Sequence, residues 1–73
     1  MFVLIEQVDY EGGYFKGVFN SMEAAIEQSG MRPEDFVSQY PMHRWSQPHG
    51  CTALWTARRE GYDVEFLIWA VAA

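Results

Sequence analysis

Alternating apolar and polar positions open the chain with a pair of strand candidates. Residues 2–9 (FVLIEQVD) carry apolar side chains on both faces in their first half, which indicates a strand buried on both sides at its start. Residues 14–19 (YFKGVF) form the second candidate. Gly12 and Gly13 supply turn chemistry between the two, because glycine reaches positive φ without steric strain. The pattern predicts an antiparallel hairpin.

A second pair of strands is predicted near the C-terminal end. Residues 51–59 alternate between the two faces of a strand, and so do residues 62–71. Glu60 and Gly61 lie between them and are typical turn residues. These segments therefore predict a second antiparallel hairpin.

Helical signals occupy the region between the hairpins. Asn20 is predicted as a helix N-cap, with Glu23 at the capping-box position three residues later. Gly30 is predicted to end this helix in the left-handed conformation. Residues 31–40 are predicted as a second, shorter helix, with Pro33 in its first turn and Pro41 after its last.

The order of these elements predicts an α+β fold, a small antiparallel sheet of two hairpins (β-β-α-β-β, with the second short helix) and helical material on one face. A chain of 73 residues is enough for one domain, here residues 1–73, and too short for two. The single cysteine excludes a disulfide within one chain and favours a reducing compartment.

No targeting or membrane segment is predicted. The N-terminal apolar run is short and no basic segment precedes it, unlike a secretory signal. The apolar run at residues 66–73 is far shorter than the roughly 20 residues that span a bilayer. We therefore expect a cytoplasmic protein that makes no membrane contact.

The charge of the chain is unevenly distributed. The formal net charge is −5, which argues against independent binding to a phosphate backbone. Residues 36–59 contain no acid, whereas all ten acids lie outside that stretch. Such polarisation suits association with a partner, although a chance distribution in a short chain explains it equally well. Ten unclustered acids are too few for a protein coated in charge, so mimicry of DNA remains only a minor alternative.

The residues with catalytic or metal-binding chemistry do not form a known pattern. His43, His49 and Cys51 lie within nine residues, but their spacing fits no standard zinc site. A thiol–imidazole pair would also need an orienting group and an oxyanion hole, and free cysteine is mostly a small buried apolar residue. We therefore expect no metal, no cofactor and no catalytic residue, with a Cys51-centred enzyme as a remaining alternative.

Residues typical of protein interfaces concentrate in the acid-free stretch. Trp, Tyr, Arg and Met are enriched at binding hot spots, and a domain of this size cannot bury all of its own. The candidate partner-binding patch combines basic and aromatic side chains: His43, Arg44, Trp45, Arg58 and Arg59. Arginine beside aromatic residues also suits single-stranded nucleic acid, which we expect only within a larger complex because of the net charge.

Residues 2–27, FVLIEQVDYEGGYFKGVFNSMEAAIE, and the last strand candidate resemble small bacteriophage and bacterial proteins. In that group, the whole chain is similar to very small phage proteins that bind host RNA polymerase. The resemblance implies a phage-encoded transcription regulator in the host bacterial cytoplasm, which inhibits initiation or modifies termination (antitermination). It implies no active site, and residues 31–59 depart from the common pattern.

An alternative of the same kind remains open. A small host-takeover inhibitor could act by protein–protein binding on a nuclease or a CRISPR complex, and the sequence does not separate the two targets. We expect the free protein to be a monomer that acts by occluding or remodelling a surface of its target.

Overall fold

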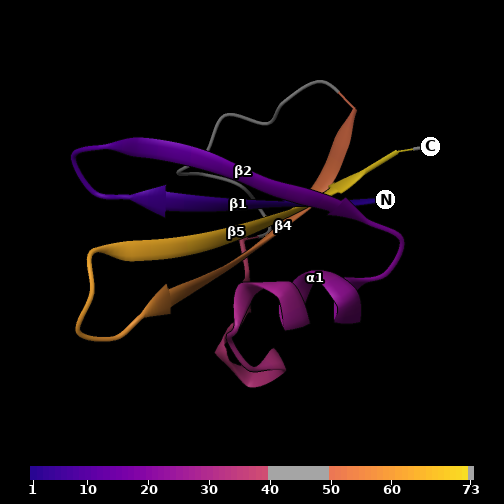
Figure 1. Cartoon of the computed structure of the whole chain (residues 1–73). Coiled ribbons are helices and arrows are strands. Elements are labelled where there is room, and N and C mark those ends of the chain that lie inside the picture. Colours follow the sequence, from indigo (N-terminus) through magenta and orange to yellow (C-terminus); the bar gives the residue numbers. More distant parts are fainter. Residues whose placement is uncertain (40–49, 73) are drawn as a thin grey trace.

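Within residues 1–39 and 50–72, which the computed structural model describes, five strands form one antiparallel sheet in the order β2-β1-β5-β4-β3. One helix lies against one face of this sheet (Figure 1). The predicted α+β class with two hairpins and helical material on one face is confirmed. Among the described residues, no helix has the length and apolar content needed to cross a membrane.

The two predicted hairpins are present with small changes at their ends. β1 (Phe2–Val8) pairs with β2 (Gly12–Phe19), and β4 (Cys51–Arg59) pairs with β5 (Val64–Val71). β4 has the predicted bounds, whereas β2 begins two residues earlier and β5 two residues later than predicted. Both differences arise at the turns, whose lengths strand alternation does not specify.

The first and last strands lie side by side at the centre of the sheet. β1 and β5 pair antiparallel from Phe2 opposite Ala70 to Val8 opposite Val64. Beyond the ladder, the Val71 amide donates a hydrogen bond of 2.8 Å to the Met1 carbonyl. This pairing joins the two hairpins and brings Met1 next to Val71 (Figure 1).

The helix α1 (Met22–Ser29) begins one residue later than the predicted cap implies. Ser21 is the N-cap, because its hydroxyl accepts a hydrogen bond of 3.1 Å from the Ala24 amide. The predicted cap at Asn20, with Glu23 at the capping-box position, is therefore wrong. Gly30 ends the helix as predicted, in the left-handed conformation with φ 76°.

The predicted second helix over residues 31–40 is wrong in the part that the structure describes. A 3₁₀-helix covers only Pro33–Asp35, and a short strand, β3 (Val37–Ser38), follows it. The Gln39 amide donates a 2.9 Å hydrogen bond to the Leu54 carbonyl, so pairing with β4 replaces helical hydrogen bonding in this segment. This is a long-range interaction that local periodicity does not show. Tyr40, which was to complete the helix, lies outside the described residues.

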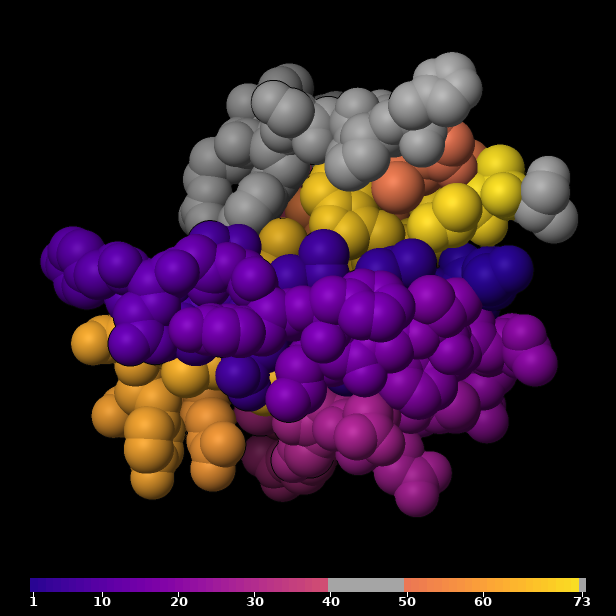
Figure 2. All heavy atoms as spheres, turned by 45° about the horizontal axis from the view of Figure 1, so that its top comes forward, coloured from indigo at the N-terminus to yellow at the C-terminus, as the bar shows by residue number. Residues whose placement is uncertain are grey.

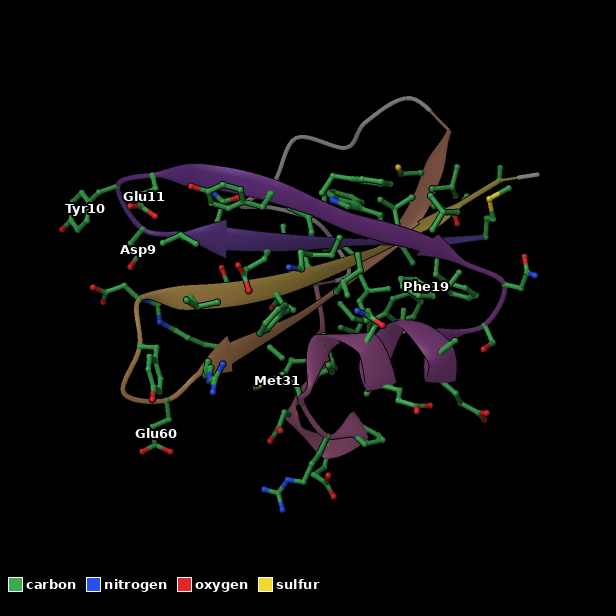
Figure 3. The ribbon with its side chains drawn as sticks, viewed as in Figure 1. Asp9, Tyr10, Glu11, Phe19, Met31 and Glu60 are labelled. Atoms are coloured by element: carbon green, nitrogen blue, oxygen red, sulfur yellow. The ribbon has the colours of Figure 1, made fainter. Side chains whose placement is uncertain are left out.

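The sheet carries an apolar cluster on each face. The cluster next to α1 contains fully buried Leu4 and Ile68, with Phe19 and Met31 packed between helix and sheet (Figure 3). The cluster on the other face is built by the residues next in sequence, because successive strand residues point to opposite faces. Its buried members are Cys51, Leu54, Leu67 and Trp69.

The first prediction concerns the cluster next to α1. Leu4→Ala should lower the free energy of unfolding by about 3 kcal/mol, because it removes a fully buried side chain and leaves a cavity. The measurement is denaturant unfolding followed by circular dichroism. The control is Val37→Ala. Val37 is 61% exposed, so this variant should lose less than about 1 kcal/mol of unfolding free energy. Equal losses in the two variants would contradict the assigned core.

Candidate functional site

The turns of the two hairpins lie together at one end of the sheet. The Asp9 amide in the first turn donates a hydrogen bond of 2.9 Å to the Asp63 carbonyl in the second. Residues 9–11 and 58–63 are called the hairpin end below. Figure 3 shows that Tyr10 and Glu60 project from its two turns, at the end of the sheet away from the chain termini.

Arg58 links the two hairpins across this end. Its Nη2 atom donates to Oδ2 of Asp9 at 2.7 Å, a charge-assisted hydrogen bond. This bond and the charge of Asp9 raise the pKa of Arg58, and Glu65 and Asp63 act in the same direction more weakly. Both partners are partly exposed, so solvent screens the attraction. The contact therefore orients Arg58 more than it stabilises the fold.

Arg59 stacks on an aromatic ring of the same turn. Its guanidinium carbon lies 4.6 Å from the centroid of the Tyr62 ring, a cation–π geometry. The Tyr62 amide donates to the Arg59 carbonyl at 3.2 Å, and Gly61 supplies a positive φ within the turn. These contacts hold Arg59 and Tyr62 as an ordered pair, and Tyr62 is exposed.

Tyr10 is the most exposed large hydrophobic residue among the described residues, and it lies at the tip of the first turn (Figure 3). Its φ of 69° makes it the one described residue other than glycine with a positive φ. Such a conformation is unusual for a bulky residue. Tyr10 and Tyr62 together give the hairpin end two exposed aromatic rings.

The hairpin end is acidic in spite of its two arginines. Asp9, Glu11, Glu60 and Asp63 stand against Arg58 and Arg59, a formal charge of −2. Arg58 and Arg59 come from the acid-free stretch of the sequence, but the two turns and β5 bring the carboxylates of Asp9, Asp63 and Glu65 near Arg58. In the described residues, this end is therefore a mixed acidic and aromatic surface.

The predicted patch is only partly placed by the structure. Arg58 and Arg59 lie at the hairpin end, whereas His43, Arg44 and Trp45 lie outside the described residues. The predicted patch did not include Tyr10, Tyr62 or Asp9. For Tyr10 a signal was present, because an aromatic residue between turn-forming residues (Asp-Tyr-Glu-Gly-Gly) has no core to enter.

The described residues do not form a recognisable chemical site. No cavity is found in this part of the molecule, and no three of its His, Cys, Asp and Glu side chains are placed to hold a metal ion. Of the three residues considered as zinc ligands in the sequence, His43 and His49 lie outside the described residues. Cys51 is buried in the cluster on the sheet face away from α1.

Comparison with known proteins does not extend this description. No family model, no curated protein and no solved structure matches this chain.

The second prediction concerns the reactivity of Cys51. Burial of the thiol should make alkylation by iodoacetamide at least about tenfold slower in the folded protein than in the denatured protein. Mass spectrometry of timed samples gives the two rates. Rapid modification of the native protein would indicate an accessible thiolate and would support the alternative that the protein is an enzyme with a Cys51-centred site.

Proposed function

We propose that this protein is a phage-encoded regulator that binds host bacterial RNA polymerase and thereby inhibits transcription initiation or modifies termination. The observation that supports a binding role is the hairpin end, where Tyr10 and the Arg59–Tyr62 pair are exposed. Tyrosine and arginine are enriched among residues that dominate binding energy. The choice of polymerase rests on the resemblance of residues 2–27 and the last strand to small phage regulators.

The proposed mechanism is occlusion and needs no chemical step. A small domain that covers a surface of the polymerase excludes whatever else uses that surface, such as a sigma factor, nucleic acid or another regulator. Residues at strand ends suit this task, because the sheet holds their positions and they lose little conformational freedom on binding. His43, Arg44 and Trp45 remain part of the proposed contact, together with Arg58 and Arg59.

The third prediction is a stoichiometric complex with bacterial RNA polymerase. The two proteins should elute together from a sizing column at about 0.15 M salt, where surface electrostatics are already screened. Separate elution would contradict the proposal for that polymerase. A complex formed instead with a nuclease or CRISPR effector would support the alternative host-takeover inhibitor.

Two double variants locate the contact. Tyr10→Asn with Tyr62→Ser, and Arg44→Ala with Trp45→Ala, should each weaken the complex by more than about 2 kcal/mol, roughly 30-fold in Kd. Asparagine tolerates the positive φ at position 10, so the turn is preserved. The control is Val37→Ser, an exposed site in β3. Undiminished binding by one double variant would remove that pair from the contact.

A further inference from the structure

The outer edge of β2 has no partner in the part of the chain that the structure describes. β2 is the first strand of the sheet order, and only β1 pairs with it. Figure 2 shows β2 crossing the front of the molecule. At the other edge of the sheet β3 has two residues, whereas β2 has eight. An open edge of this length is a template for another strand.

The residues with outward backbone groups follow from the hydrogen bonds of β1. The Asp9 amide and the Met1 carbonyl form hydrogen bonds on the β5 side. The backbone N–H and C=O groups of odd-numbered residues in β1 therefore point toward β5, and those of even-numbered residues point toward β2. The register then directs the backbone groups of Gly12, Tyr14, Gly17 and Phe19 toward β1. The backbone groups of Gly13, Phe15 and Val18 point outward.

Two of these outward residues also expose apolar side chains. Phe15 is 68% exposed and Val18 is 47% exposed. They pair with Ile5 and Val3 and therefore share the sheet face away from α1. The same residues thus combine exposed apolar surface with backbone groups that pair with no strand in residues 1–39 and 50–72, and an added strand would satisfy both.

We propose that the occupant of this edge is β2 of a second copy of the chain, paired antiparallel about a two-fold axis through Phe15. The irregularity between Leu4 and Ile5 leaves Lys16 as an extra residue, so Gly13, Phe15 and Val18 lie opposite every second residue of β1, which are Gln7, Ile5 and Val3. The axis sets Phe15 opposite the partner's Phe15. It also sets Val18 opposite the partner's Gly13. The proposal uses none of the residues of the hairpin end and is independent of the proposed function.

Side-chain sizes and charges fit this register. Two phenylalanines opposite each other form a favourable cross-strand pair, and Val18 meets a glycine that has no side chain. On the other face, Lys16 comes beside the partner's Tyr14, which pairs with the partner's Glu6 in β1. β2 itself contains no acid, so the excess negative charge of each copy lies on other elements.

The area involved sets the expected strength. An edge-to-edge contact between two eight-residue strands lies at the low end of specific interfaces, below about 1,200 Å² in total. Such a dimer has a dissociation constant of roughly 10 μM to 1 mM, so it is monomeric when dilute. The bulge at Lys16 limits the pairing to one register, which favours a closed dimer over open stacking.

The fourth prediction is tested by sedimentation of the full chain from about 10 μM to about 1 mM, a range that brackets weak association. The average mass should rise from one copy to two. Phe15→Glu places like charges opposite each other at the axis and should raise the dissociation constant at least tenfold. Val37→Glu, which adds the same charge at the β3 edge, should leave it unchanged. Circular dichroism checks that both variants are folded.

Amide hydrogen exchange of the native chain gives a second test that needs no variant. The amides of Phe15 and Val18 should be protected in the concentrated sample and exchange freely in the dilute one. The Tyr14 amide, which faces β1, should be protected in both. The proposal would be overturned if sedimentation gives a mass of one copy throughout the range or assembly beyond a dimer. It would also be overturned if the Phe15 amide is unprotected in a dimeric sample.

Discussion

The pairing of β1 with β5 is the interaction on which the rest of this structure depends. An isolated two-stranded hairpin is marginal in water, and this ladder joins two of them into one sheet. It places Leu4 opposite Ile68 in the cluster beneath α1, and Ile5 opposite Leu67 on the other face. Because the two strands come from opposite ends of the chain, the cluster beneath α1 forms only when this long-range contact forms, and the other cluster gains Val3 and Ile5 from it.

The same pairing assembles the hairpin end. Asp9 and Arg58 are 49 residues apart in sequence. Asp9 follows β1 and Arg58 lies in β4, and the two meet only because both strands pair with β5. The surface therefore depends on sheet register. A shift of one residue between β1 and β5 would separate Asp9 from Arg58 and would also move the apolar residues of β1 to the wrong face. Selection for a buried core thus maintains the geometry of an exposed surface.

The sequence predicted local features well and contacts between elements poorly. Alternation located β4, and the glycine at position 30 located the end of α1, because both depend on neighbouring residues. β3 was missed because its pairing with β4 is long-range. For the same reason Arg58 was predicted in a basic patch, whereas carboxylates from other segments surround it. The open edge of β2 depends on strand order, which periodicity does not reveal.

The contact between Met1 and Val71 gives the chain a nearly circular path. A short linker between these residues would turn the β1–β5 ladder into a local hairpin, and new termini could then be opened in the turn between β1 and β2. In such a permuted chain β1–β2 would become the distant pairing and β1–β5 the near one, with the native sheet preserved. Which contact limits the folding rate would then be decided by the position of the break in the backbone.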